Sequence, residues 1–248
     1  MPQYSKTGAG LSEEDLKNCY ALRLSIVALK PETDPAVDFE KFTAFVRKSQ
    51  FVEYLTDNGQ IKAFFVTYFS EQLIQGQNCL VIEPEYGFAH PDYRKGTYVR
   101  MTFARIVRNL KLRYWYKPIY IVGCAYPHSF IAFNRLFEGD FWTMESSNIS
   151  DLDKAILINF LTRKTGKIDI ASGIIQVPTL HKERTPEHIA ILKQNPFYTT
   201  YCAQNPDWEK GQTLAFVVRI SWWVLLKSVF STKAKIRTHQ QSTKTVQI

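Results

Sequence analysis

The spacing of apolar residues changes near residue 50 from a helical to a strand-like period. From residue 12 to residue 49, apolar side chains recur at helical spacing, which predicts two helices. The first begins at Ser12, which forms a capping-box pattern with Asp15. Pro31 and Pro35 break this pattern, and the second helix is expected near Phe39–Ser49. The apolar positions of the first helix are Leu16, Tyr20, Leu24 and Val27.

Beyond residue 50 the pattern predicts antiparallel strands. Phe51–Thr56 and Ile61–Phe69 are rich in β-branched and aromatic residues, and the Asp57-Asn58-Gly59 between them is typical of a hairpin turn. Another turn is expected at Gln75–Asn78. Cys79–Ala89 is the third strand, and a proline and a glycine within it predict a bend or bulge.

A polar turn, a helix, a buried strand and a further helix follow. The turn is His90–Gly96, and Thr97–Tyr116 has helical spacing with five basic side chains between the apolar ones, which we expect to form a solvated face. Ile119–Ala125 is almost wholly apolar, as in a strand buried in a parallel pair. Ser129–Phe137 is the last helix of this set. The order predicts an α/β (mixed α+β) fold with a mixed, mostly antiparallel central sheet flanked by helices.

The chain beyond Trp142 has less regular signals and is expected to elaborate this core. We expect a helix at Asp151–Lys164 and a strand at Ile170–Val177. Leu214–Phe230 is the most hydrophobic stretch, and its end, Ser221–Phe230, is expected to be a core helix or a helix in a membrane interface. The predicted organisation is a flexible N-terminus (1–11), a core (12–142), an extension packed on the core (143–230) and a basic disordered tail (231–248).

Charge and cysteine spacing narrow the classes of partner. The net charge of +8 favours anionic partners, either a phosphate-bearing small molecule or an anionic membrane surface. We expect no nucleic acid partner, because the chain has no repeated basic and aromatic module that stacks bases. The four cysteines lack zinc-ligand spacing, so no metal is expected. The start of the sequence lacks a secretory signal pattern, so we expect a cytoplasmic protein, membrane-associated in one alternative.

The turn His90–Gly96 has the composition of an anion-binding site. The first N–H groups of a helix have no partner within it, and the helix dipole places positive potential there. Arg94 and Lys95 add side-chain donors, and Gly96 allows close approach of the backbone. The alternative interpretation is an ordinary surface loop with solvated charges.

This turn resembles a motif of the GCN5-related N-acyltransferase (GNAT) superfamily. The family motif reads V-x-P-x-[YF]-R-G-x-G, and the order of predicted elements over about half of the chain is similar to that of the family. The glycine pattern of this turn differs from that of the family motif: the turn is one residue shorter and lacks the second glycine. The resemblance implies that an acyl-CoA or acetyl-CoA co-substrate binds at Phe88, Ala89, Arg94, Lys95, Gly96 and Thr97.

The resemblance also implies direct acyl transfer from a thioester to an amine acceptor. A base takes a proton from the amine, the amine attacks the thioester, and backbone N–H groups of the bulged strand polarise the carbonyl. Glu85 and Glu83 alternate onto one face of that strand and are the candidate bases, with His90 and His128 behind them. Their alternative role is that of solvent-facing strand residues, and His128 is otherwise expected to cap the helix.

The family's frequent general-acid tyrosine is missing from the last helix, where Leu136 and Phe137 stand. Tyr126 or His128 is the candidate acid in its place. The alternative function is therefore a non-catalytic GNAT-fold binding or scaffold protein, peripheral to a membrane through its C-terminal helix.

Tyr20-Ala21-Leu22-Arg23 resembles the acyl-homoserine-lactone synthase and N-acyl amino acid synthase branch of the superfamily. That branch implies a longer acyl thioester on CoA or on acyl carrier protein, and a basic surface suits the acidic carrier. The alternative for Arg23 is an ion pair with a core carboxylate.

Overall fold

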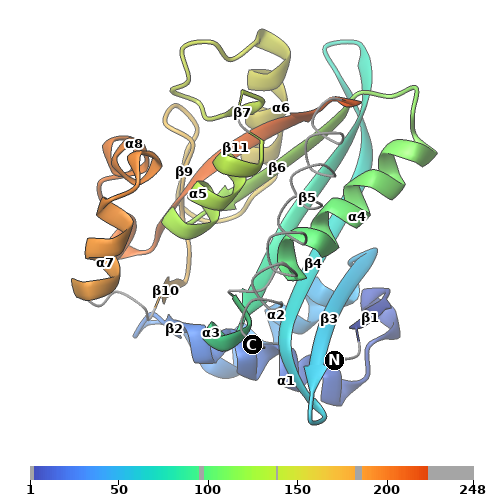
Figure 1. The fold of residues 1–248 in the computed structure, drawn as a ribbon, viewed down its shortest axis with the longest axis vertical. Helices are drawn as coiled ribbons and strands as arrows, with labels where there is room; N and C mark the ends of the chain where they lie inside the picture. The colour runs from blue at the N-terminus through green and yellow to red at the C-terminus, as the bar shows by residue number, and fades with distance from the viewer. Residues whose placement is uncertain (1–2, 95–97, 138, 182–185, 223–248) are drawn as a thin grey trace, which may run out of the picture.

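The computed structural model describes residues 3–94, 98–137, 139–181 and 186–222 (Figure 1). In chain order the elements are β1 (Gln3–Lys6), the 3-10 helix η1 (Gly8–Gly10), α1 (Glu13–Ile26), β2 (Val27–Leu29), α2 (Pro35–Arg47), β3 (Phe51–Asp57), β4 (Gln60–Ile74), β5 (Gln77–Ala89), α3 (Pro91–Arg94), α4 (Tyr98–Arg113), β6 (Ile119–Ala125), α5 (Pro127–Leu136), β7 (Phe141–Trp142), α6 (Asp151–Thr162), β8 (Ile168–Asp169), β9 (Ile174–Gln176), β10 (Thr179–His181), α7 (Pro186–Lys193), α8 (Pro196–Gln204), the 3-10 helix η2 (Trp208–Lys210) and β11 (Gln212–Ile220).

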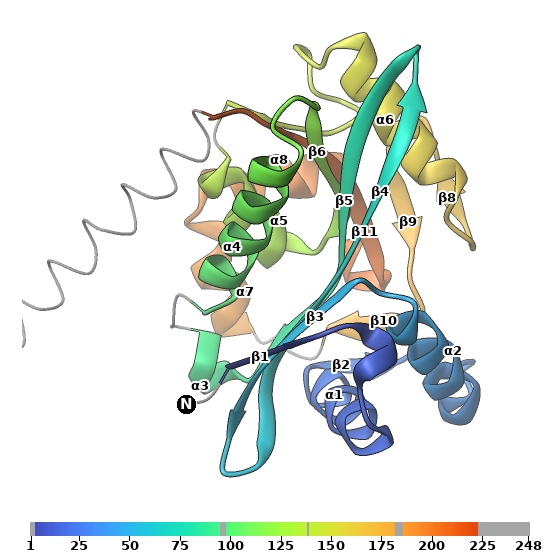
Figure 2. The ribbon, with the colours of Figure 1, turned by 90° about the vertical axis from the view of Figure 1, so that its right-hand side faces the viewer.

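A mixed, mostly antiparallel sheet forms the centre of the molecule. Its strands are ordered β1-β3-β4-β5-β6-β11-β9-β8, with β7 pairing with β11, and the pair β5–β6 is parallel. Figure 2 shows α4, α5, α7 and α8 on one face of the sheet, and α1, α2 and α6 on the other. Buried side chains pack accordingly into one large cluster under α4, α5 and α8 and two clusters under α1–α2 and α6. The expected fold class is confirmed.

The first two helices begin where local chemistry places them. The Ser12 hydroxyl accepts a hydrogen bond from the Asp15 N–H, and the Asp15 carboxylate accepts one from the Ser12 N–H, so the predicted capping box is present. The second helix begins earlier than predicted, because Pro35 occupies its first turn after the Asp34 cap and does not only end the previous pattern. The N-terminus also differs from the expectation, since Gln3–Lys6 pair with β3.

The predicted hairpins are confirmed. Asn58 and Gly59 have φ values of 49° and 75°, which is the backbone that a tight hairpin turn requires. Gln75 and Gly76, with φ values of 50° and 78°, join β4 to β5 in the same way. The predicted parallel burial of Ile119–Ala125 is also confirmed, since this strand lies between β5 and β11.

The main correction concerns the end of the chain. The apolar stretch that begins at Leu214 was given no secondary structure before Ser221, and Gln212–Ile220 form β11, which pairs with β6, β7 and β9. The extension therefore supplies a central strand rather than only packing on the core. Ile170–Val177, expected as one strand, is instead a turn followed by β9, which pairs with β8. Trp223 and the tail lie outside the described residues.

The described helices include none that is long and apolar enough to span a membrane. The predicted solvated basic face of α4 is partly corrected, because Lys111 is buried and its ammonium lies 5.5 Å from the centre of the Trp222 ring.

Candidate active site at the divergence of β5 and β6

The strands β5 and β6 pair over a short distance and then separate. Their parallel register comprises Leu80–Ile119, Val81–Tyr120 and Ile82–Ile121. Beyond Ile82, β5 continues beside β4 while β6 continues beside β11, and Figure 1 shows the two strands diverging. In the described part of the chain, the facing edges of β5 and β6 therefore have backbone N–H and C=O groups with no strand partner across the opening.

The predicted bulge lies at the start of this opening. The register between β4 and β5 passes from Thr67–Pro84 to Val66–Tyr86, so Glu85 is the extra residue. The strands are closely packed at this point. A Cβ added to Gly123 of β6 would lie 3.2 Å from the Phe216 ring and 3.5 Å from the Pro84 carbonyl oxygen. Glu85 and Glu83 lie on the same side of the strand, as their spacing of two residues predicts, and both reach Lys164.

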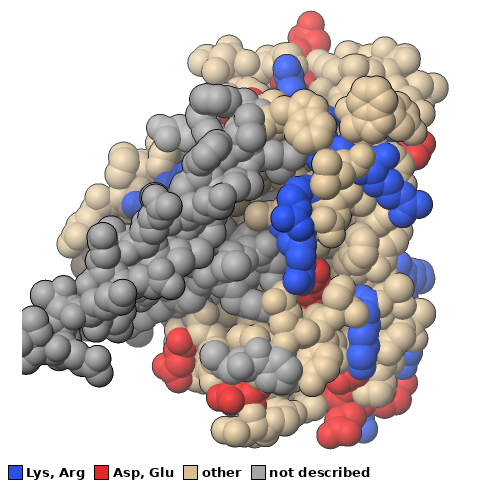
Figure 3. All heavy atoms as spheres, turned by 45° about the vertical axis from the view of Figure 1, so that its right-hand side comes forward, with Lys and Arg blue, Asp and Glu red and all other residues tan. Residues whose placement is uncertain are grey.

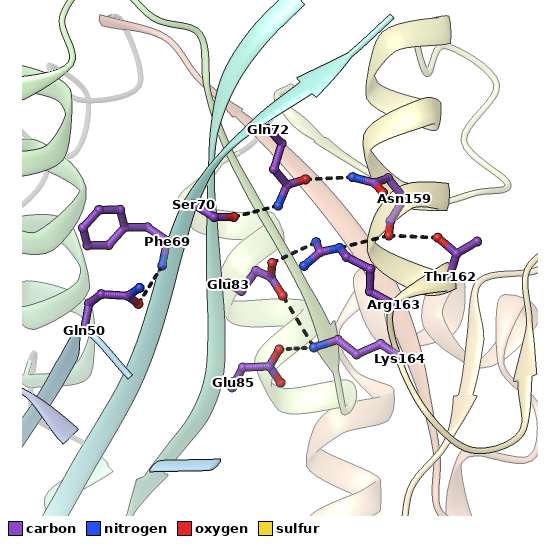
Figure 4. Close-up of polar contacts among 10 residues, drawn as sticks. All are labelled: Gln50, Phe69, Ser70, Gln72, Glu83, Glu85, Asn159, Thr162, Arg163 and Lys164. Atoms are coloured by element: carbon purple, nitrogen blue, oxygen red, sulfur yellow. Dashed lines mark hydrogen bonds and ion pairs between the residues drawn. The ribbon is translucent and has the colours of Figure 1, made fainter. Parts of the chain in front are cut away.

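Two cations at the end of α6 form ion pairs with the candidate bases (Figure 4). Arg163 pairs with Glu83, and Lys164 pairs with both Glu83 and Glu85. Glu83 is buried; one carboxylate oxygen lies 2.9 Å from Arg163 and the other 3.6 Å from Lys164. Lys164 also donates a hydrogen bond to Glu85. The predicted solvent-facing alternative is wrong for Glu83. Glu85, which is half-buried, also has a cationic partner.

The end of α6 is held in place by contacts to the sheet. The Asn159 side chain donates a 2.8 Å hydrogen bond to Gln72 of β4 (Figure 4). The Arg163 Nε donates a 3.2 Å bond to the Asn159 carbonyl, and the Lys164 ammonium lies 4.4 Å from the centre of the Phe160 ring. Cations at a helix C-terminus also interact favourably with the helix dipole. Arg163 and Lys164 are therefore positioned rather than freely extended.

Burial controls the protonation of this site. It raises the pKa of the Glu85 carboxyl, against the opposing effect of Lys164 and with a smaller contribution from Glu83. Burial likewise raises the pKa of the Cys124 thiol on β6 to about 12, with Glu85 adding to the shift. Cys124 therefore stays a neutral thiol near neutral pH, which disfavours it as a nucleophile. The raised pKa makes the Glu85 carboxylate a stronger base than an exposed glutamate.

The predicted anion-binding turn contains a short helix. The chain leaves β5 at Ala89 and forms α3, and α4 is described from Tyr98 onward. The Tyr93 hydroxyl donates a 2.5 Å hydrogen bond to Asp57, which ties α3 to the β3–β4 hairpin. The side chain of Arg94, and residues Lys95, Gly96 and Thr97 as a whole, lie outside what the structure describes. Their role in binding a donor stays a prediction.

Two other predicted donor-binding residues pack against the core. The ring of Phe88, which is partly buried, lies 5.6 Å from the Phe64 ring and 6.1 Å from the Tyr86 ring. Ala89 is buried with Leu55 and Ala63, and Tyr93 packs against them. The role of Phe88 and Ala89 in binding a donor stays a prediction.

The candidate acids follow β6. Tyr126 is the N-cap residue of α5, and its hydroxyl donates a 2.9 Å hydrogen bond to the Thr179 carbonyl of β10. The helix begins at Pro127, so His128 lies in its first turn and is not the cap that was expected near Ser129. The half-buried His90 is 3.4 Å from the Asp92 carboxylate.

Arg23 is a structural residue. It is buried on α1 and forms a bidentate ion pair with Asp38 of α2, beneath the rings of Tyr20, Phe42 and Tyr86. The Arg23 guanidinium and the Tyr20 hydroxyl hold the pKa of the Asp38 carboxyl below its usual value, although burial opposes them. The alternative prediction for Arg23, an ion pair with a core carboxylate, is confirmed.

Arg163 and Lys164 were not predicted as residues of the candidate site. Lys164 stands 79 positions from its partner Glu85, and at the end of a helix two basic residues carry no local signal that distinguishes them from surface charges. Among the residues that the structure describes, His, Cys, Asp and Glu side chains form no group of three or more that could hold a metal ion.

No protein-family model matches the sequence, and no curated protein matches it. Solved structures similar to the chain include a protein from Enterococcus faecalis V583, described as "Probable N-Acyltransferase", at 13% identity and a TM-score of 0.43, covering 56% of this chain and 33% of that one. The ribosomal-protein-S18-alanine N-acetyltransferase of Escherichia coli has 13% identity and a TM-score of 0.42, covering 89% and 95%. The NatC complex bound to Gag peptide and CoA has 8% identity and a TM-score of 0.43, covering 89% and 100%. The chain thus spans about a third of the Enterococcus protein.

Proposed function

We propose that the protein is an N-acyltransferase that transfers an acyl group from a thioester, acyl-CoA or acyl carrier protein, to an amine. The observation that supports this most is the divergence of β5 and β6 directly beside a bulge that carries Glu85. An extended donor can add to the unpaired edge of β5 through backbone hydrogen bonds. The turn after Ala89 and the start of α4 then suit the phosphates of CoA.

The proposed chemistry uses three groups of the chain. The Glu85 carboxylate accepts a proton from the acceptor ammonium, directly or through a water, and the neutral amine attacks the thioester carbonyl carbon. A backbone N–H at the open edge of β5 donates to the oxygen that becomes negative. The carbon–sulfur bond breaks, the thiolate takes a proton from Tyr126 or His128, and the nitrogen of the new amide gives its extra proton back to that residue through water. The neutral Cys124 thiol favours this direct route over an acyl-cysteine intermediate.

Calorimetric titration with CoA, acetyl-CoA and longer acyl-CoAs tests the donor. We expect saturable CoA binding that is weakened by Arg94→Ala and kept by Glu85→Gln. Release of free CoA with a panel of amines should fall by about 10²-fold or more in Glu85→Gln, the loss typical of a general base. A folded protein that binds none of these ligands excludes CoA and acyl-CoA as the donor.

The second candidate is a non-catalytic binding protein. The ion pairs that Arg163 and Lys164 make with Glu83 and Glu85 favour it, because a paired carboxylate is a weaker base. CoA binding without turnover on any amine, equal in the wild type and in Glu85→Gln, is its expected result. Turnover that depends on Glu85 rules it out.

A further inference from the structure

Several large apolar side chains project from one end of the described molecule. Trp115, Tyr116 and Leu112 lie at the end of α4, with 67%, 62% and 58% of their surface exposed. Leu73, near the turn between β4 and β5, is 76% exposed, and Trp222 follows β11. We call these five residues the α4-end patch. Exposed apolar side chains that cluster in this way mark an interaction site.

Contacts between the elements show that the patch is continuous. Lys117 forms an ion pair with Glu71, two residues from Leu73 on the same strand, and its ammonium lies 5.5 Å from the Tyr116 ring. Lys111 lies 5.5 Å from the Trp222 ring and donates a 3.4 Å hydrogen bond to the Lys117 carbonyl. The hairpin, the helix end and the residue after β11 therefore meet around Lys111 and Lys117.

The surroundings of the patch are basic. Arg108 and Arg113 are exposed on α4; Arg108 lies one helical turn before Leu112, and Arg113 follows Leu112 in sequence and lies 5.5 Å from the Tyr114 ring. Figure 3 shows blue cationic side chains between tan surfaces in the upper part of this face, while most red carboxylates in the view lie along its lower edge. Tryptophan and tyrosine surrounded by lysine and arginine suit the boundary between lipid headgroups and acyl chains.

We infer that the α4-end patch binds an anionic membrane surface, with Trp115 and Tyr116 entering the headgroup layer and Arg108 and Arg113 contacting acidic lipids. The shape of the patch favours a lipid surface over a protein, because its side chains project from a hairpin end and a helix end. A fluid headgroup layer adapts to such projections, whereas a protein would need a matching cavity. Apart from Arg219, the side chains of Leu214–Ile220 are buried in the sheet and take no part in this surface.

The test is co-sedimentation of the full chain with vesicles of phosphatidylcholine alone or mixed with phosphatidylserine. We expect binding to the mixed vesicles, and Trp115→Ala/Tyr116→Ala should lower the partition constant about tenfold. Arg108→Gln/Arg113→Gln should lower it on mixed vesicles by about fivefold per charge and change little on neutral ones. The control is Ile191→Ala on α7, whose side chain is 64% exposed on another side of the molecule and should leave binding unchanged.

Three results overturn the inference. The first is that the intact chain fails to bind mixed vesicles. The second is that Trp115→Ala/Tyr116→Ala binds them as the wild type does. The third is that sedimentation velocity shows a wild-type dimer without affinity for vesicles and a monomeric Trp115→Ala/Tyr116→Ala variant, which makes the patch an interface between copies. Thermal unfolding of each variant checks that the fold is kept. CoA binding is measured separately and has no bearing on these outcomes.

Discussion

Glu85 owes its chemical character to its burial and to two charged neighbours. It lies at a bulge in β5, on the same side of the strand as Glu83 and within reach of Lys164, and burial raises its pKa. Lys164 lowers that pKa and Glu83 raises it, so the two neighbours act in opposite directions on the same proton. The sequence identified both glutamates as candidates, but their cations come from a distant helix, and only tertiary structure brings the four groups together.

The opposing effects of Lys164 and Glu83 predict pH profiles that shift in opposite directions. A base works only when deprotonated, so kcat/KM should rise with pH through the raised pKa of Glu85. Lys164→Met removes a charge that lowers this pKa, so its acidic limb should move to higher pH. Glu83→Gln should move the limb to lower pH. Profiles of CoA release measure both, and shifts in the same direction contradict the role of Glu85.

At the scale of elements, local chemistry predicted most of the first half of the chain. The Ser12 capping box, the Asn58-Gly59 turn and the proline in β5 each act within a few residues, so their outcomes can be read from sequence. The continuous apolar run at Leu214 has no helical or alternating period, and such a run suits a buried helix and a central strand equally. Pairing with β6 makes this run a strand, and β6 is remote from it in sequence.

The position of β11 predicts a large effect of a core truncation there. Leu214 is fully buried and pairs with Ala125 of β6 and Ile174 of β9. Leu214→Ala should lower the free energy of unfolding by about 3 kcal/mol, through lost burial and an unfilled cavity. Urea denaturation measures this. The control Val37→Ala, at a position 43% exposed on α2, should stay within about 0.5 kcal/mol of the wild type.

At the scale of the molecule, the excess of positive charge should steer anionic ligands. The chain carries a net charge of +8, and the proposed donor ends in phosphates. We expect the dissociation constant of CoA to increase as salt is added, because screening shortens the range of charge interactions from about 10 Å at 0.1 M to about 3 Å at 1 M. Pantetheine, which carries no phosphate, is the control and should bind equally well at low and high salt. If CoA and pantetheine showed the same salt dependence, the phosphates of CoA would not interact with the positive charge of the protein, which contradicts the prediction.

The place of β11 also bears on how the chain is synthesised. Strand β6 ends at Ala125, but its neighbour Leu214 leaves the ribosome only after most of the second half has been translated. Until then one border of the nascent sheet is an apolar strand with bare amides, which is a template for pairing with other polypeptides. Ribosome-stalled fragments ending before Gln212 should accordingly recruit chaperones, and extension through Ile220 should release them.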